Sequence, residues 1–308
     1  MKLKKPKFWD YEKPNLYATI LNPLALFLQL LNSFKRKTYK QDLKIKTICF
    51  GNIYLGGTGK TSLCIALKNI LDQRKIKSCF IKKYYEDQYD EQNILKKYGK
   101  LFTAKRRIDA IKKAENENYD FAILDDGLQD KSIVPDINIV CFNNINWIGN
   151  GLTIPAGPLR ENINNLKNYD HVILNGNSEN LESIKKKILS INSKINIHVG
   201  KYEVQNISNF KKSENYLVFS GIGNHKSFIS MLKNEGLNVI KDLEFPDHYQ
   251  YSKDEINKIV LNAEILNCKI ITTEKDYLRL ENIKSDKIQF VKSQIKIFDE
   301  SKFLNAVI

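Results

Sequence analysis

A short glycine-rich segment, Gly56-Gly57-Thr58-Gly59-Lys60-Thr61, carries the residues of this chain that are best suited to chemistry. Glycines free the backbone to curl, so that successive N–H groups can point at one phosphate. The Lys60 ammonium would pair with β- and γ-phosphate oxygens, and the Thr61 hydroxyl is a natural Mg²⁺ ligand. We therefore predict a nucleotide-phosphate site made of Gly56, Gly57, Thr58, Gly59, Lys60, Thr61 and Ser62.

The sequence on either side of this loop supports the prediction. The apolar run Ile45–Phe50 precedes it, and a helical pattern over Ser62–Leu71 follows it. A helix that starts at the loop directs the positive end of its dipole toward a bound phosphate. The usual pattern has a further glycine five residues before Gly59. This chain has Tyr54 at that position, so the loop is a GGTGKT variant.

An acidic pair, Asp125-Asp126, ends the apolar run Phe121–Leu124. In P-loop proteins an acidic residue at such a strand end holds Mg²⁺, directly or through water. Two adjacent carboxylates without a cation would repel each other, which favours a metal. The alternative is a plain Asp-Gly turn formed by Asp126 and Gly127.

The elements that must position these residues follow from the pattern of apolar runs. Short β-branched runs alternate with charged segments of helical period. Expected strands cover Ile45–Phe50, Ser78–Ile81, Phe121–Leu124, Ile137–Phe142 and His171–Leu174. Expected helices lie near Ser62–Leu71, Glu91–Tyr98 and Arg106–Asn116. This alternation predicts an α/β fold with a mostly parallel sheet covered by helices on both faces.

A polar stretch near Gln205–Glu214 is the predicted linker to a second, smaller α/β domain. The alternation resumes beyond it at Tyr216–Ser220, Lys226–Asn234, Asn238–Leu243, Lys253–Leu266 and Lys269–Thr273. We therefore expect an N-terminal segment of residues 1–37, a P-loop domain of residues 38–210 and a smaller domain of residues 211–308. The final helix could pack back on the P-loop domain.

The composition restricts the classes of partner. The 49 Lys and Arg residues against 35 Asp and Glu residues give a net charge of +14, which attracts polyanions such as anionic lipid or phosphorylated substrates. An AT-rich coding sequence would produce a similar excess of lysine. The sequence has no cluster of arginine and aromatic residues for stacking on bases, so no nucleic-acid partner is expected. The five cysteines are scattered without a CxxC pair and indicate small core residues in a reducing compartment.

The N-terminal segment has the composition of a membrane contact. The apolar run Leu16–Leu31 follows the aromatic residues Phe8, Trp9 and Tyr11 and precedes Lys35-Arg36-Lys37. The run is short for a full span, and it lacks the small-residue cleavage site of a secretory signal. Aromatic residues at one end and cations at the other suit a helix at the membrane interface, with the cations facing anionic headgroups. The alternative is an ordinary buried helix.

Taken together, the motifs resemble a known family, the tetraacyldisaccharide 4′-kinases (lipid A 4′-kinases) of Gram-negative bacteria. In chain order the matching stretches are GNIYLGGTGKT, Asp90-Glu91, Leu124–Gln129, Gly149–Glu161, Phe219–Asn224, Phe245–Tyr249 and Thr272–Asp276. They cover most of the chain, and the N-terminal apolar run is similar to the membrane-embedded helix of that family. The resemblance implies a P-loop kinase domain and a smaller α/β domain with the active site between them.

The resemblance also implies a reaction. ATP would give its γ-phosphoryl group to the 4′-hydroxyl of a tetraacylated glucosamine disaccharide 1-phosphate, a lipid A precursor, with Mg²⁺ as cofactor. Because the acceptor is a membrane lipid, the resemblance also implies a peripheral or monotopic enzyme at the cytoplasmic face of the bacterial inner membrane. Such a hydroxyl must be oriented and deprotonated.

The resemblance assigns roles to individual residues. Asp90 corresponds to the catalytic base of the family and His248 to its partner. We expect Arg160 to stabilise phosphoryl charge and Glu161 to assist at Mg²⁺ or at the substrate. The expected metal-associated residues are thus Thr61, Asp125, Asp126 and Glu161, with Glu91 and Gln129 as supporting residues.

Two stretches depart from the family pattern. Where the family commonly has Ser-Arg-Gly-Tyr-Gly, this chain has Ile81-Lys82-Lys83-Tyr84-Tyr85, which puts contacts to a substrate phosphate there in question. Where the family commonly has His after the LQ of DDGLQ, this chain has Asp130, which leaves the role of that imidazole unfilled.

Two other functions remain as alternatives. One is a membrane-associated P-loop NTPase switch that hydrolyses nucleotide without a lipid acceptor. Thr273-Glu274-Lys275-Asp276 has some likeness to a guanine-reading motif, although the order of its residues differs. The other is a non-catalytic membrane-binding protein with a relic nucleotide site, which the intact Lys60, Thr61, Asp90 and Asp125 disfavour.

Overall fold

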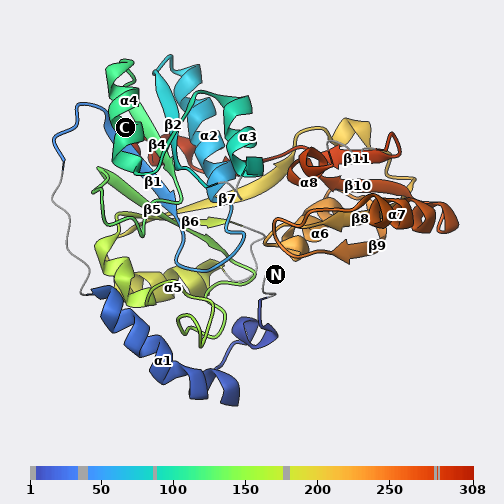
Figure 1. The fold of residues 1–308 in the computed structure, drawn as a ribbon, viewed down its shortest axis with the longest axis horizontal. Coiled ribbons are helices and arrows are strands. Elements are labelled where there is room, and N and C mark those ends of the chain that lie inside the picture. Colours follow the sequence, from blue (N-terminus) through green and yellow to red (C-terminus); the bar gives the residue numbers. More distant parts are fainter. Residues whose placement is uncertain (1–4, 34–40, 86–88, 176–180, 281–282, 284) are drawn as a thin grey trace.

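The computed structural model describes residues 5–33, 41–85, 89–175, 181–280, 283 and 285–308. In this part of the chain, eight strands form one large sheet and four strands form a second sheet. Figure 1 shows the two sheets side by side, with the smaller one on the right and helix α1 below the larger one.

The large sheet has the order β12-β7-β6-β5-β1-β4-β2-β3. Its strands are β1 (Lys46–Gly51), β2 (Ser78–Lys83), β3 (Leu101–Ala104), β4 (Phe121–Asp125), β5 (Ile137–Asn143), β6 (His171–Asn175), β7 (Asn196–Val204) and β12 (Ser293–Ile297). All neighbours pair in parallel except β12, which runs antiparallel to β7. The carboxyl ends of β1, β4, β5 and β6 therefore meet at one edge, which is where α/β sheets bind their ligands.

Helices cover both faces of this sheet, which explains why its central strands β1, β4 and β6 are buried along almost their whole length. Alternate residues of β1 show the two faces: Ile48 and Phe50 belong to one buried cluster, and Cys49 belongs to another. The first cluster includes side chains of α2 (Lys60–Gln73), α3 (Tyr89–Tyr98) and α9 (Glu300–Val307). On the opposite face lie α4 (Arg107–Asn116) and α5 (Leu181–Ile191). The predicted α/β class with a mostly parallel, helix-covered sheet is confirmed.

The smaller sheet is fully parallel, in the order β11-β10-β8-β9. It consists of β8 (Asn215–Ser220), β9 (Asn238–Glu244), β10 (Lys269–Thr273) and β11 (Ile288–Val291). Helix α6 (His225–Asn234) covers one face and α7 (Lys253–Ile265) the other, while α8 (Glu274–Arg279) follows β10. The chain then returns to the large sheet through β12 and α9. The division of the chain at residues 210 and 211 stays a prediction.

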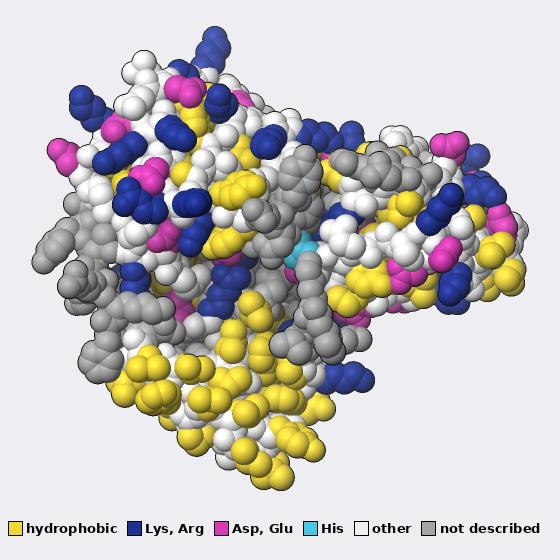
Figure 2. All heavy atoms as spheres, in the orientation of Figure 1, with side chains coloured by type: hydrophobic (Ala, Val, Ile, Leu, Met, Phe, Trp, Pro, Cys, Tyr) yellow, Lys and Arg dark blue, Asp and Glu magenta, His cyan; other side chains and the backbone are white. Residues whose placement is uncertain are grey.

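Helix α1 (Leu16–Ser33) exposes its large apolar side chains, whereas a core helix buries them. Its inward positions hold the small residues Ala18 and Ala25, both fully buried. Its large apolar side chains point outward: Leu16, Tyr17, Ile20, Leu24, Leu26, Phe27, Leu28, Leu30 and Leu31. They form the apolar patch that fills the bottom of Figure 2. Within the described residues, no helix combines the length and apolar character that a membrane crossing requires.

Candidate active site

The predicted phosphate loop lies between β1 and α2. Gly59 is the N-cap of α2 and has a φ of 83°, a left-handed conformation that favours glycine. Lys60 is therefore the first residue of the helix, with Thr61 behind it. The Lys60 Nζ donates to Asn52 Oδ1 at 3.1 Å and lies 3.7 Å from Asp126 Oδ1. The N-terminus of α2 and the Lys60 ammonium thus lie together, and their positive charges suit an anion-binding site.

Tyr54, which stands where the usual loop has glycine, has a structural role. It is buried and forms an antiparallel bridge with Leu159. Two backbone bonds continue this contact, from Arg160 N to Ile53 O (2.7 Å) and from Leu55 N to Pro158 O (2.8 Å). The segment that ends in Arg160 and Glu161 is thereby tied to the phosphate loop.

The acidic pair at the end of β4 lies beside the loop, but its two carboxylates have different partners. Asp125 is fully buried; its Oδ2 accepts from Thr61 Oγ1 at 3.2 Å and from Lys82 Nζ at 2.7 Å. Asp126 accepts from Arg160 Nη1 at 2.8 Å. Burial raises the pKa of the Asp126 carboxyl, but Lys60 and Arg160 outweigh that effect and hold the pKa below its usual value.

Glu161 and Gln129 form a second polar group next to Arg160. Gln129 Nε2 donates to Glu161 Oε1 at 2.9 Å, and Arg160 Nη1 donates to Gln129 Oε1 at 3.3 Å. Tyr169 also donates to Glu161 Oε1, at 2.7 Å. The structure therefore brings Thr61 and Asp125 into direct contact. Asp126 instead pairs with Arg160 and Lys60, and Glu161 accepts from Gln129, Asn165 and Tyr169. In the described part of the chain, no cluster of three or more His, Cys, Asp and Glu side chains is arranged to hold a metal.

Lys82 is a site residue that the sequence did not reveal. It is 1% exposed, on β2, and its Nζ donates to both Asp125 Oδ2 and Glu91 Oε2 at 2.7 Å. Burial alone lowers the pKa of the Lys82 ammonium, but the two carboxylates raise it above its ordinary value. A lysine buried between two carboxylates is an ion-pair residue of the protein itself rather than a surface contact to a substrate phosphate.

We expect Lys82→Met to lower the free energy of unfolding by about 3–5 kcal/mol, because it leaves the fully buried Asp125 carboxylate without its cation and Glu91 with only the more distant Lys275. Chemical denaturation of the variant measures this loss. Lys82→Arg keeps the charge, so it should recover most of the stability. Lys83→Met changes the next residue of the same strand, which is partly exposed, and should stay within about 1 kcal/mol of the parent. A Lys82→Met protein as stable as the Lys83→Met protein would contradict this account.

Asp130, the second departure from the family pattern, also has a structural partner. Its Oδ2 accepts from Arg107 Nη1 at 2.8 Å, and Arg107 Nη2 donates to the carbonyl oxygen of Asp126 at 2.5 Å. Burial raises the pKa of the Asp130 carboxyl, but Ser132 and Arg107 outweigh it and lower the pKa. Asp130 thus holds the arginine that fixes the acidic turn.

Asp90 and Glu91 lie in the first turn of α3, and the side chain of Asp90 falls outside the described part of the structure. Glu91 meets the second domain: its Oε1 lies 3.8 Å from His248 Nε2 and 3.5 Å from Lys275 Nζ. Burial raises the pKa of the Glu91 carboxyl, yet Lys275 and Lys82 outweigh this and hold the pKa well below its usual value. The structure therefore brings His248 next to Asp90's neighbour across the domain boundary.

The loop Gly221–Asn224 of the second domain covers the phosphate loop. A Cβ atom placed on Gly57 would lie 3.0 Å from Asn224 N, so there is no room for a side chain between the two backbones. Ser227 Oγ accepts from Asn143 Nδ2 at 3.1 Å, at the carboxyl end of β5. The second domain thus lies over the same edge of the large sheet as the candidate phosphate site.

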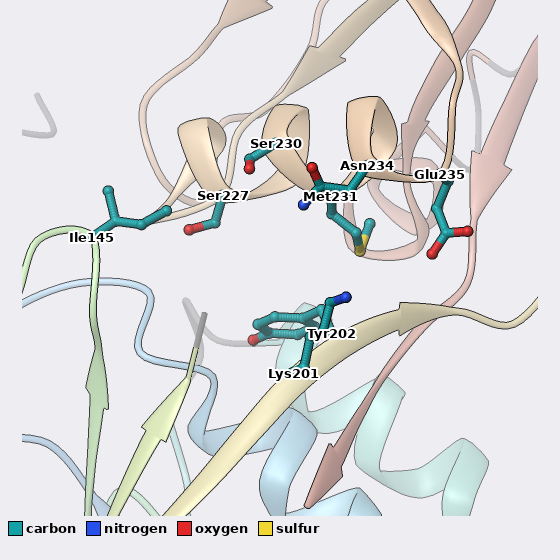
Figure 3. Close-up of a pocket in the computed structure, with 8 residues that line it drawn as sticks. All are labelled: Ile145, Lys201, Tyr202, Ser227, Ser230, Met231, Asn234 and Glu235. Atoms are coloured by element: carbon teal, nitrogen blue, oxygen red, sulfur yellow. The ribbon is translucent and has the colours of Figure 1, made fainter. Parts of the chain in front are cut away.

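A small pocket opens next to this contact, between β7 and α6 (Figure 3). Its lining residues are Ile145, Lys201, Tyr202, Ser227, Ser230, Met231, Asn234 and Glu235. The ring of Tyr202 faces Met231 and Ser227 across the opening. The pocket adjoins the phosphate loop, because a Cβ placed on Gly59 would lie 2.6 Å from the Tyr202 hydroxyl oxygen.

A strand, a glycine loop, a helix that starts with lysine and threonine, and an acidic strand end together define a P-loop nucleotide-binding protein. Comparison with known proteins makes this assignment specific. The family model described as tetraacyldisaccharide-1-P 4′-kinase matches residues 17–308. The chain belongs to that family.

Individual relatives agree with the family model. A tetraacyldisaccharide 4′-kinase of Pelagibacter ubique is 57% identical over 308 residues, which is 100% of this chain and 98% of the relative. One from Rickettsia canadensis is 33% identical and covers 93% of this chain and 91% of the relative. The crystal structure of LpxK from Aquifex aeolicus in complex with ATP has the same fold, with a TM-score of 0.68 and 20% identity over 95% of this chain and 98% of that one.

Proposed function

We propose that this kinase transfers the γ-phosphoryl group of ATP to the 4′-hydroxyl of a tetraacyl glucosamine disaccharide 1-phosphate, a step of lipid A biosynthesis. The observation that carries the proposal is the meeting of two sets of residues at one edge of the large sheet. The P-loop domain contributes Lys60, Thr61 and Asp125, and the second domain contributes His248 opposite Glu91. Family membership identifies the acceptor.

In this proposal the residues Gly56–Ser62 surround the triphosphate. The backbone N–H groups of the loop and the Lys60 ammonium bind the β- and γ-phosphates. Arg160, which contacts Asp126 at 2.8 Å, is close enough to the loop to stabilise the charge on the transferred phosphoryl group. Cations fixed before the reaction are effective because they need no reorganisation during it.

Magnesium fits the residues next to the loop. Asp125 Oδ1 is buried and has no hydrogen-bond partner among the described residues, and the Thr61 hydroxyl lies at the other oxygen of the same carboxylate. A buried, unpaired carboxylate oxygen is unfavourable unless a cation or water completes it. Thr61 and Asp125 would hold the ion, with Asp126 and Glu161 as further carboxylates nearby. When bound, the ion would supply positive charge that offsets the negative charge of the phosphates.

The acceptor hydroxyl would enter between the two domains. We assign Asp90 as the base that accepts its proton and His248 as the partner that orients this exchange. Glu91 supports them, because it joins the first turn of α3 to His248 and Lys275. Gln129 keeps Arg160 and Glu161 in place.

We propose that the nucleotide base binds at the pocket in Figure 3. It offers the aromatic face of Tyr202 on one side, Met231 on the other, and polar atoms of Ser227 and Asn234 around them. Aromatic faces stack on flat rings, and a few polar groups fix the orientation of a bound ligand. The pocket also lies beside Gly59, within reach of a base whose phosphates occupy the loop.

We propose that the enzyme binds the cytoplasmic face of the bacterial inner membrane through α1, as a peripheral or monotopic protein. The apolar patch of α1 in Figure 2 supports this, because monomeric proteins rarely expose a continuous surface of large apolar side chains. The acyl chains of the substrate lie in the same layer. The predicted basic cluster Lys35-Arg36-Lys37 lies outside the described residues.

The double substitution Ile20→Glu/Leu24→Glu should reduce binding to vesicles that contain anionic lipid by more than about tenfold, because each buried apolar side chain contributes about 1.5–3 kcal/mol. Cosedimentation with the vesicles measures it. Leu261→Glu/Ile265→Glu is the matched control: two exposed apolar residues with the same spacing on α7 of the second domain. Equal sedimentation of the two variants would refute the role of α1.

The proposed reaction is tested by incubating the purified protein with γ-labelled ATP and the disaccharide 1-phosphate lipid in detergent micelles. We expect label on the 4′-oxygen of the lipid, and no transfer to a lipid that already carries a 4′-phosphate. Release of labelled inorganic phosphate at the same rate with and without lipid, and no labelled lipid, would instead identify an NTPase without a lipid acceptor.

A further inference from the structure

A buried ion pair in the second domain, Asp276 with Arg279, has no place in the chemistry described so far. The Asp276 side chain is fully buried, that of Arg279 is 2% exposed, and Arg279 Nη1 lies 2.8 Å from Asp276 Oδ1. A buried ion pair often contributes little to stability, because the loss of hydration offsets the attraction. Asp276 ends the TTEKD stretch and Arg279 lies one helical turn beyond it, and the contacts of the pair indicate another role.

The pair fixes the backbone of one residue, Gly221, at both its N–H and its carbonyl oxygen. Gly221 N donates to Asp276 Oδ1 at 3.0 Å, and Gly221 O accepts from Arg279 Nη1 at 2.7 Å. Tyr251 donates to the same Asp276 oxygen at 2.9 Å, and Thr273 donates to the other at 2.6 Å. Both oxygens of the Asp276 carboxylate thus accept hydrogen bonds, and one of these bonds fixes the backbone N–H of Gly221.

Gly221 in turn holds His248. The backbone N–H of His248 donates to Gly221 O at 3.1 Å. His248 has a φ of 58°, a conformation that costs free energy for a residue with a side chain and persists only where the surroundings impose it. The backbone of Gly221 is tightly packed against the segment around His248, because a Cβ on Gly221 would lie 3.0 Å from both Pro246 O and Tyr249 Cβ.

We propose that Asp276 and Arg279 are positioning residues of the kinase reaction, which hold His248 toward Glu91 and the first turn of α3 through the backbone of Gly221. The inference rests on the role that we propose for His248. A displacement of about 1 Å in a reacting group can lower turnover strongly, so the pair acts on catalysis without touching the substrate.

The test is a double-mutant cycle on kcat at saturating ATP and lipid, with His248→Ala, Arg279→Met and the double variant. We expect Arg279→Met to lower kcat by about tenfold in the parent and to have almost no effect in the His248→Ala background, because its effect passes through that residue. Arg279→Lys, which keeps the positive charge but replaces the planar guanidinium with an ammonium on a shorter side chain, should recover part of kcat.

Tyr251→Phe provides a milder variant if Arg279→Met does not fold. It removes one hydrogen bond to Asp276 and should lower kcat severalfold, again only where His248 is present. Tyr216→Phe is its control, since Tyr216 is a buried tyrosine of the same domain that donates to Lys211 O, and it should keep the parent kcat.

Three results overturn the inference, and they are distinguishable. Parent kcat in His248→Ala would remove the proposed role of His248, and the inference with it. A reduced kcat in His248→Ala that multiplies with the Arg279 or Tyr251 effect would refute the inference alone. A folded Arg279→Met or Tyr251→Phe enzyme with lowered melting temperature and parent kcat would show that the pair only stabilises the domain.

Discussion

We expect Lys60→Ala to lower kcat/KM for ATP by about two to three orders of magnitude. The Lys60 ammonium is the cation at the start of α2, next to the left-handed Gly59 that turns the loop. A positioned donor that stabilises charge on the reacting group contributes about 10²–10³ in rate. Steady-state phosphorylation of the disaccharide lipid, with ATP varied, measures the loss.

The fold should tolerate this substitution. Within the described residues, the Lys60 side chain makes a hydrogen bond to Asn52 and a longer ion pair with Asp126, and Asp126 keeps Arg160 as a closer cation. Lys253→Ala is the matched control, because Lys253 is also the first residue of a helix but is exposed in the second domain. The control should have the parent rate, and a Lys60→Ala enzyme with that same rate would remove the phosphate-binding role of the loop.

The parts of the fold that a sequence pattern can predict are those with a local cause. The strand predicted over Phe121–Leu124 is observed as β4, Phe121–Asp125, because a strand buried on both faces needs an unbroken apolar run. The glycine loop is predictable for a similar reason, since its conformation and its ligand are determined by consecutive residues. In the second domain, the apolar run Tyr216–Ser220 likewise corresponds to β8.

The strands that were not predicted lie where the pattern is mixed or the partner is distant. Strand β7 (Asn196–Val204) alternates between buried and exposed residues and contains Gly200 and Lys201, so it lacks an apolar run. Its partner β12 lies about ninety residues further along the chain, with the whole second sheet between them. No local pattern in the sequence predicts that the chain returns to the large sheet after it has formed the smaller one.

Lys82 shows that the site, like the sheet, depends on distant contacts that a local sequence pattern does not predict. A lysine at the end of an apolar strand normally reaches solvent, and the two lysines Lys82-Lys83 look equivalent in the sequence. Only the tertiary arrangement, which places Glu91 and Asp125 on either side of one of them, makes Lys82 a buried ion-pair residue. The hydrogen bond from His248 N to Gly221 O is hidden from the sequence for the same reason.

Asp90→Asn should lower kcat by about 10²–10⁴, the range that a general base contributes, while the KM for ATP stays close to that of the parent. Asn has the size of Asp but does not accept the proton of the acceptor hydroxyl. The backbone around it is held by other residues: Gln92 Nε2 donates to Tyr85 O at 2.8 Å, and Glu91 is bound by Lys82. The substitution should therefore leave the first turn of α3 in place.

Asp109→Asn is the control for a carboxylate in the first turn of a helix. Asp109 lies in α4 with a partly exposed side chain paired to Arg106, and its loss should leave kcat unchanged. The split between kcat and KM distinguishes the base from a nucleotide-binding residue, because a group that acts only in proton transfer leaves ATP binding intact. An Asp90→Asn enzyme that keeps the parent kcat would transfer the role of base to another group at the domain boundary, and His248 would be the first to test, since its Nε2 lies 3.8 Å from Glu91.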